Sequence, residues 1–324
     1  MTGPDSVRLG TVDDWMHAAD SHGIVSRADL GAAGLRSRDI ARMSQTGMLT
    51  VLARGWYAVG PVAVEDERHV LTVRAMLRSH EGRAVAGHHS ALLVLGLPTL
   101  GADLKVVRLS RRTAGPTNTT PRVRLGRAVP MRLQRAETVA PGLAVVQHGV
   151  SVGPLSALVA ADGALRLGLA TRTDLDEALD AVRQHPYTGG IEQMLKYADG
   201  RHESPGETRL GHALRLLGIS ATPQVRLTSG RAVAIVDFLV DDAAVVIEFD
   251  GRVKYGRGAD EMDPFGRRRP AAEVLWEEKR REDWVRWLGY EVVRVVSRDL
   301  DEPASLDARI RRAVIRARGR RRSA

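Results

Sequence analysis

The stretch Val236–Gly251, VDFLVDDAAVVIEFDG, decides how the C-terminal third of this chain folds. Two runs rich in Val, Ile and Phe flank an Asp-Asp pair, which is typical of two buried strands joined by a tight turn. These apolar runs are interrupted by three acids, Asp237, Glu248 and Asp250. A buried carboxylate is costly unless it is paired, hydrogen-bonded or bound to a metal, so the three acids require an explanation.

A two-residue loop at the Asp-Asp pair places Val240 opposite Ala243 and Asp237 opposite Val246, and a four-residue loop gives the same register. Cross-strand partners point to the same face, as do residues two apart on one strand, so Asp237, Glu248 and Asp250 are expected on one face. Asp237 and Glu248 are then diagonal neighbours, roughly 7–8 Å apart between backbones, and both carboxylates can reach one ion. Hard oxygen ligands from two strands suit Mg²⁺, with Mn²⁺ as the alternative metal. A slip of one residue would turn Asp237 to the other face.

Two of the candidate acids also have a purely structural explanation. Asp250 precedes a glycine and fits a turn at the end of a strand. Glu207 stands three residues after Ser204, as in a capping box in which the Glu side chain accepts from the N-cap amide. Asp237 and Glu248 lie within strands and lack such an explanation, so they carry the metal-site hypothesis.

The composition indicates an ordinary water-soluble globular protein. The chain has 324 residues, enough for two or three domains, with 44% hydrophobic and 27% charged residues. There is no cysteine, which excludes disulfides and thiolate metal sites. No apolar run is long enough to span a membrane, and MTGPDSVRLG at the N-terminus lacks the apolar core of a signal peptide. We therefore expect a cytoplasmic protein with no membrane partner.

The net charge of +9 is concentrated at the C-terminus. Residues 309–324, RIRRAVIRARGRRRSA, hold eight of the 48 Lys and Arg and no acid, which leaves 40 basic against 39 acidic residues elsewhere. Such a run is either a solvated, frayed tail or a set of phosphate contacts that do not read sequence. On the second interpretation the arginines that bind DNA are Arg311, Arg312, Arg316, Arg318, Arg320, Arg321 and Arg322.

The sequence pattern of residues 1–62 predicts short helices followed by two strands. Three helices are expected, over residues 11–23, 26–34 and 37–47. Residues 48–60, MLTVLARGWYAVG, alternate like two strands turned at an Arg-Gly pair. This order is typical of a winged helix-turn-helix, whose third helix enters the major groove of double-stranded DNA. The residues facing DNA are then Arg36, Arg38 and Arg42. The alternative is a small protein-binding module of the same shape.

The remaining chain mixes helices and strands. Residues 63–200 contain no catalytic constellation, phosphate-binding loop or dinucleotide-binding glycine pattern, and the adjacent His88-His89 pair fits a helix start. From residue 201 the predicted order is helix, three strands, helix and strand, which indicates an α/β domain. We therefore divide the chain into 1–62, 63–200, 201–308 and an Arg-rich basic tail at 309–324.

Motifs in both halves resemble known families. The C-terminal motifs are SPGE at 204–207, VDF at 236–238, IEFDG at 247–251, RRED at 280–283 and LGYEVVRV at 288–295. They resemble the endonuclease-like domain related to very-short-patch-repair nucleases, a group with the PD-(D/E)XK, or restriction-endonuclease-like, fold. The N-terminal region, with GHHSALLVLGLP at 87–98 and AADGALRLGL at 160–169, resembles AbiEi-family antitoxins of type IV toxin–antitoxin systems.

The nuclease resemblance implies roles for individual residues. Asp237 and Glu248 would be the metal ligands, and Glu207 the helix carboxylate that holds a metal-bound water. The general motif has Glu-x-Lys, whereas this chain has Asp250 at the lysine position. A lysine there would stabilise the attacking hydroxide or the phosphate charge. The candidates to replace it are Lys254, Lys279 and Arg281.

Two functions are therefore open. The first is a DNA-binding protein whose C-terminal domain is an Mg²⁺-dependent endonuclease hydrolysing phosphodiester bonds. The alternative is a non-catalytic DNA-binding transcriptional regulator or antitoxin, with a cognate toxin as partner or a role in phage defence. The acid at position 250 leaves open whether the chain is an enzyme.

Overall fold

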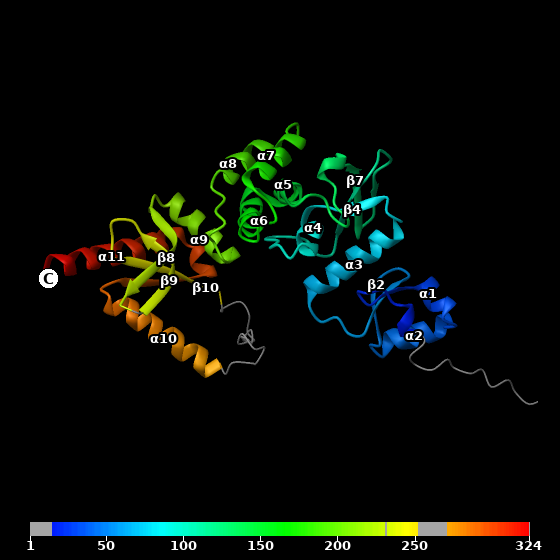
Figure 1. Cartoon of the computed structure of the whole chain (residues 1–324), viewed down its shortest axis with the longest axis horizontal. Helices are drawn as coiled ribbons and strands as arrows, with labels where there is room; N and C mark the ends of the chain where they lie inside the picture. The colour runs from blue at the N-terminus through cyan, green and yellow to red at the C-terminus, as the bar shows by residue number, and fades with distance from the viewer. Residues whose placement is uncertain (1–14, 231, 252–270, 324) are drawn as a thin grey trace, which may run out of the picture. The chain divides into compact units, whose positions relative to one another are not determined.

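The computed structural model describes residues 15–230, 232–251 and 271–323, which form two compact units (Figure 1). The first unit holds the chain up to Ala160 together with Leu169–Lys196. The second unit holds Ala161–Gly168 and the chain from Tyr197 onward, so it takes one segment from the middle of the sequence. No helix in the described ranges is both long and apolar enough to cross a membrane.

The first unit begins with a winged-helix-like region. Its elements are η1 (Met16–Ala18), β1 (Ile24–Ser26), α1 (Arg27–Ala32), α2 (Ser37–Gln45), β2 (Leu49–Ala53) and β3 (Trp56–Val59). The strands form a sheet of order β1-β3-β2. Leu30 of α1 and Ile40 and Met43 of α2 are buried in one core with Val25 and Leu49. The second and third predicted helices and the two-stranded wing are thus confirmed.

The first predicted helix, over 11–23, is wrong in its described part. Residues 11–14 lie outside the described residues, and the helical structure after them is limited to the single 3-10 turn of η1. The Asp20 carboxylate accepts hydrogen bonds from the backbone amides of His22 and Ile24, at 2.9 Å each. Such side-chain bonds to the local backbone compete with helix formation, and the chain continues into β1, which pairs antiparallel with β3.

The rest of the first unit is a mixed α/β arrangement. Its elements are α3 (Glu65–Ser79), β4 (Ala84–Ala86), α4 (His88–Val94), β5 (Val107–Arg111), β6 (Asn118–Thr119), β7 (Val123–Ala128), η2 (Met131–Leu133), α5 (Pro141–Val152), α6 (Pro154–Arg166), α7 (Arg172–Ala181) and α8 (Thr188–Leu195). A sheet of order β4-β5-β7-β6 carries one parallel pair, β5 with β7. The last residues of α6, from Ala161, belong to the second unit.

The second unit encloses a four-stranded sheet between helices. Its further elements are α9 (Pro205–Leu216), β8 (Ala221–Ser229), β9 (Ala232–Val240), β10 (Val245–Asp250), α10 (Ala271–Trp287), β11 (Glu291–Val296), η4 (Ser297–Asp301) and α11 (Pro303–Ser323). The sheet order is β11-β10-β9-β8, and only β10 and β11 run parallel. Helices α9 and α11 contribute to the core on one face, and α10 packs on the other (Figure 1). This layering is the α/β class expected from the order of the predicted elements.

The register of the central hairpin differs from the predicted one. Val246 pairs with Leu239, and Ile247 with Phe238, because the loop between β9 and β10 comprises residues 241–244 and Val240 ends the strand opposite Val245. The prediction that Asp237 lies opposite Val246 is therefore wrong by two residues. A shift of two residues preserves the face of each side chain. Extended by one residue, the observed register places Asp237 directly across from Glu248.

The Arg-rich segment continues a packed helix. Helix α11 begins at Pro303, and its residues Ile310, Ala313 and Ala317 are buried in the core of the second unit. The apolar residues recur at three- to four-residue spacing and form one face, while the side chains of Arg311, Arg312, Arg316, Arg318 and Arg320 are exposed. Residues 309–323 are thus not a frayed run.

Candidate functional site

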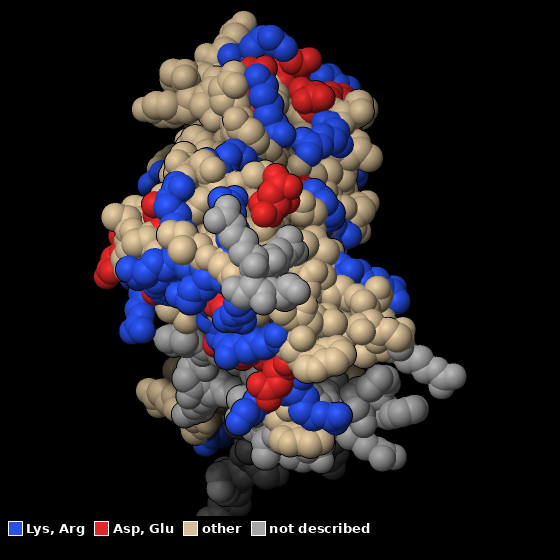
Figure 2. Space-filling model, turned by 90° about the vertical axis from the view of Figure 1, so that its left-hand side faces the viewer, with Lys and Arg blue, Asp and Glu red and all other residues tan. Residues whose placement is uncertain are grey.

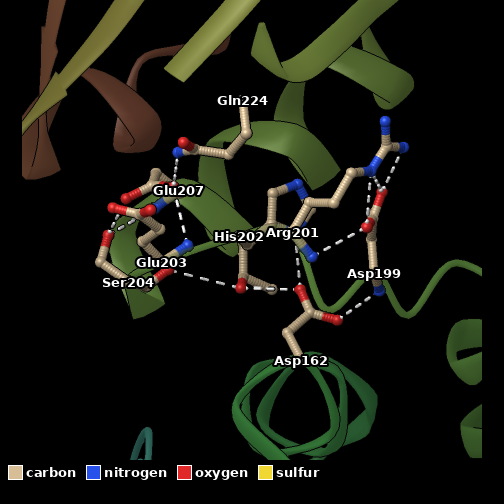
Figure 3. Close-up of polar contacts among 9 residues, drawn as sticks. Asp162, Asp199, Arg201, His202, Glu203, Ser204, Glu207 and Gln224 are labelled. Carbon is tan, nitrogen blue, oxygen red and sulfur yellow. Dashed lines mark hydrogen bonds and ion pairs between the residues drawn. The ribbon is translucent and has the colours of Figure 1, made fainter. Parts of the chain in front are cut away.

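Glu207 is fixed at the start of α9 by hydrogen bonds from three directions (Figure 3). Its side chain is only 7% exposed, and Oε2 accepts from the backbone amide of Glu203 at 2.8 Å and from Gln224 Nε2 at 2.9 Å. Oε1 accepts from the Ser204 hydroxyl at 2.8 Å. Ser204 and Pro205 begin the helix as predicted, but Glu207 accepts from the amide of Glu203 and not from that of Ser204. The carboxylate therefore caps α9 and also contacts strand β8.

The Asp237 carboxylate is influenced by both Glu207 and Glu248. Burial, with the negative charges of Glu207 and Glu248 nearby, raises the pKa of Asp237 to about 6, although the Phe249 amide and the Arg281 guanidinium oppose the shift. The Phe249 amide donates to Asp237 Oδ2 at 2.7 Å. The charges of Glu207 and Glu248 act on Asp237 in this way only because they lie near it. The structure thus brings together three acids taken from α9, β9 and β10.

Arg281 supplies a positive charge beside these acids. Its Nη2 donates to Glu248 Oε1 at 2.9 Å, and its Nη1 donates to the backbone carbonyl of Ile235 at 2.9 Å. Glu248 itself is 8% exposed. Two bonds from one guanidinium to a strand carbonyl and a buried carboxylate hold the cation in a fixed orientation. Lys254, Lys279 and Arg281 were the candidates to replace the missing lysine, and Arg281 contacts the Glu248 carboxylate.

The other residues of the predicted site have different surroundings. Asp250 is partly buried, and its Oδ2 lies 4.0 Å from Nη1 of Arg294 on the parallel neighbour β11. Lys254 lies outside the described residues. Lys279 is exposed on α10.

Strands β8 and β9 are irregular next to Asp237. Gln224 of β8 has a φ of 53°, which is uncommon for a residue other than glycine. The register pairs Pro223 with Phe238 and Val225 with Val236, on either side of this point. Val236 packs in the core on the α10 side, whereas Phe238 packs in the core under α9 and α11. Strained backbone of this kind clusters at functional sites, and here it places the Gln224 amide on Glu207.

Asp237 and Glu248 are the residues that could hold a metal with few protein ligands. Among the residues that the structure describes, no three His, Cys, Asp or Glu side chains are spaced to hold a metal ion together. Mg²⁺ commonly keeps several waters and binds one or two carboxylates, which Asp237 and Glu248 would provide. Burial first, and then the charges of Glu207 and Glu248, raise the pKa of Asp237, and a cation bound at this point would oppose both effects.

Two parts of this site were not predicted from the sequence. Gln224 carries no motif, and its role depends on a backbone conformation that no local pattern announces. Asp162 interrupts the apolar sequence of α6, yet it is 1% exposed and hydrogen-bonded to residues before and within α9. An acid within an apolar run was the signal that could have found it.

A second candidate surface lies on α2. Arg36, Arg38 and Arg42 are all exposed, while Ile40 and Met43 of the same helix are buried. Arg38 lies 3.9 Å from Asp39, and the contact is on the surface, where such pairs contribute little. The helix therefore presents a basic outer face.

The arginines of α11 differ in their pairing. Arg316 and Arg320 both contact Glu291, and Arg311 pairs with Asp307 at 2.8 Å. Arg312 and Arg318 have no ion pair within the described part of the chain. The side chains of Arg321 and Arg322 lie outside it. Figure 2 shows Lys and Arg side chains spread over one face of the molecule among fewer acids.

Comparison with known proteins finds a family match within the N-terminal region. Residues 16–60 match the sequence model of a family described as "Transcriptional regulator, AbiEi antitoxin". The match covers η1 to β3, the winged-helix-like region. A search of curated proteins finds no match.

A solved structure of the RV2827C protein from Mycobacterium tuberculosis is also similar to part of the chain. The identity is 18%, and the alignment covers 64% of this chain and 81% of that one with a TM-score of 0.34. This level of structural similarity supports no argument about fold or function.

Proposed function

We propose that this protein is a DNA-binding transcriptional regulator of the antitoxin type that contacts double-stranded DNA through α2. The observation that carries the proposal is the agreement between two independent results at one place. Residues 16–60 match the AbiEi antitoxin regulator family, and the same residues form a helix-turn-helix with a wing and an exposed basic helix. By the same family relation, a cognate toxin is the protein partner that we propose.

Gel-shift titration with the promoter upstream of the gene tests this proposal. The double variant Arg38→Ala and Arg42→Ala should lose most of its affinity, because it removes two exposed cations from the helix that faces the groove. Arg83→Ala, another exposed arginine of the first unit, serves as the control and should bind like wild type. Binding of the promoter no tighter than binding of unrelated DNA would refute the proposal.

A second candidate function is Mg²⁺- or Mn²⁺-dependent hydrolysis of DNA phosphodiester bonds by the second unit. The observation that favours it is geometric: Glu207 and Glu248 are buried, the Phe249 amide beside Glu248 donates to Asp237 Oδ2 at 2.7 Å, and Arg281 Nη2 donates to Glu248 Oε1 at 2.9 Å. Asp237 and Glu248 would bind the metal, and Glu207 would orient a water. A bound Mg²⁺ would polarise the phosphate and lower the pKa of a coordinated water. Arg281 would offset charge that develops on the phosphate, which is the task of the lysine in the general motif.

Cleavage assays on duplex, single-stranded and mismatched DNA test the second candidate. Asp237→Ala and Glu248→Ala should each abolish metal-dependent cutting. Asp242→Asn is the matched control, because Asp242 is exposed in the turn of the same hairpin and its positive φ of 58° suits asparagine. A wild-type protein that binds neither metal and cuts none of these DNA forms would exclude hydrolysis. Promoter binding by Asp237→Ala would still support the regulator.

A further inference from the structure

A buried carboxylate from α6 holds the segment that leads into α9 (Figure 3). Asp162 is 1% exposed, and its Oδ1 accepts from the backbone amide of Asp199 at 2.7 Å. Its Oδ2 accepts from His202 Nδ1 at 2.7 Å and from the Thr208 hydroxyl at 2.8 Å. His202 and Thr208 are themselves 6% and 1% exposed. Three donors between residues 199 and 208 therefore converge on one carboxylate, which is the arrangement that makes a buried acid tolerable.

The histidine of this group is fixed in orientation as well as in place. Donation from Nδ1 to Asp162 sets which ring nitrogen carries the proton. The other ring nitrogen lies against α9, since a Cβ added at Gly211 would be 3.0 Å from His202 Nε2. A glycine in the interior of a helix is less favourable than alanine, and here it leaves room for the imidazole. The ring thus ties the loop before α9 both to α6 and to the middle of α9.

The same segment carries Glu207. Thr208, which donates to Asp162, is the next residue along α9, and the Glu203 amide and Ser204 hydroxyl that bind Glu207 lie in the tethered loop. On the sheet side, a Cβ at Gly206 would be 1.9 Å from Phe249 Cε1, so the first turn of α9 is pressed against β10. The position of the Glu207 carboxylate is therefore set from two sides, by the sheet and by Asp162.

We infer that Asp162, acting through His202 and Thr208, is a positioning residue that sets Glu207 against Asp237 and Glu248. This role deepens the hydrolytic function proposed above and rests on it. Outer partners that orient the groups of a metal site typically contribute about 10–100-fold to metal affinity or activity. Asp162 comes from a helix remote in sequence from the three acids, so its contribution arises only in the folded second unit.

One test measures the position of the Glu207 carboxylate by NMR, without metal or DNA. The Gln224 side-chain amide donates to Glu207, so its NMR signal in the intact chain, assigned by its loss in Gln224→Leu, reports where that carboxylate lies. Asp162→Asn and Thr208→Val should move or broaden this signal. Thr208→Ser keeps the hydroxyl and should preserve it. An unchanged Gln224 signal in folded Thr208→Val and Asp162→Asn would overturn the inference.

A second test measures Mn²⁺ binding by the intact chain. Affinity should fall about 10–100-fold in Asp162→Asn and Thr208→Val and stay near wild type in Thr208→Ser. Leu216→Ala, an exposed residue of α9, is the control. Wild-type affinity in Thr208→Val would contradict the inference. If wild type binds no Mn²⁺, hydrolysis fails as a function, while the Gln224 signal still decides whether Asp162 positions Glu207. If Asp162→Asn does not fold, the comparison of Thr208→Val with Thr208→Ser tests the inference in both measurements, the Gln224 signal and the Mn²⁺ affinity.

Discussion

Gly206 determines how closely the first turn of α9 approaches β10. The Cβ of an alanine at this position would overlap the Phe249 ring, with three ring atoms within 2.6 Å. Phe249 lies between Glu248 and Asp250 in the sequence, so any displacement of its ring acts on the acids directly. This contact explains why a helix start that already has Ser204 and Pro205 also contains a glycine.

We predict that Gly206→Ala destabilises the protein by about 1–3 kcal/mol, the range for overpacking a filled core. The measurement is urea unfolding followed by circular dichroism. Gly319→Ala in α11 is the matched control, because nothing lies within 4 Å of a Cβ added there and alanine favours helix. Equal stability of the two variants would show that the first turn of α9 adjusts freely.

Buried histidines make the first unit sensitive to acid. His89 Nε2 donates to the Val106 carbonyl at 2.9 Å, and His148 Nε2 donates to the Leu100 carbonyl at 3.1 Å. Burial lowers the pKa of each imidazole to about 4. In the unfolded chain a histidine titrates near 6.5, so between these two values the unfolded state binds more protons.

The expected result is full stability above about pH 6.5 and a progressive loss as the pH falls towards about 4. The loss amounts to at most about 3 kcal/mol for each imidazole. Urea unfolding at a series of pH values measures it. His148→Asn removes one of the titrating groups, so its stability should depend less steeply on pH. An identical pH dependence in wild type and His148→Asn would show that His148 does not contribute.

At the scale of elements, α11 combines a structural face with a basic one. Ile310, Ala313 and Ala317 are in the core, so the helix cannot leave the second unit without exposing apolar surface. Arg316 and Arg320 are partly neutralised by Glu291. Arginines without such a partner are the better phosphate ligands, because no existing ion pair has to be exchanged.

Replacing both Arg312 and Arg318 by alanine should therefore weaken non-specific DNA binding. The slope of log K against log salt should become shallower by about 2, since each lost phosphate contact contributes roughly 0.9. Replacing both Arg316 and Arg320 should change the slope less. Binding measured by fluorescence anisotropy over a salt series gives these slopes. Equal effects of the two double variants would show that pairing with Glu291 is irrelevant to DNA binding.

The central hairpin shows how far local sequence predicts an element. The alternation of apolar residues predicts both strands, and the pairwise spacing predicts that Asp237 and Glu248 share a face. The register is wrong by two residues, because it depends on whether Asp241 to Ala244 form the loop. The Asp-Asp pair indicates a turn but does not fix at which residue the second strand begins, which here is Val245.

At the scale of the whole molecule, the second unit includes a segment that precedes residue 201, the domain boundary predicted from the sequence. Ala161–Gly168 belongs with the chain from Tyr197, and this segment brings Asp162. A fragment of residues 201–324, cut at the predicted domain boundary, leaves the His202 and Thr208 donors without the carboxylate that binds them.

Residues 201–324 should therefore be less stable than residues 154–324. Each buried polar group left without its partner costs about 1–3 kcal/mol. Urea unfolding of the two fragments measures the difference, and Asp162→Asn in the longer fragment is the control, because it should reproduce part of the loss. Equal stability of the two fragments would show that α6 is dispensable for the second unit.

The sequence by itself determined the elements whose signals are local. Among these are the capped start of α9 at Ser204, the turn-separated strands of the wing, and the two acids that interrupt the strands of the hairpin. The tertiary structure alone decided the four-residue loop, the contact of Arg281 with Glu248, the Gln224 bond to Glu207 and the anchoring by Asp162. These depend on which distant segments pack together. Packing is selected by the burial of the whole core, and no window of neighbouring residues contains that information.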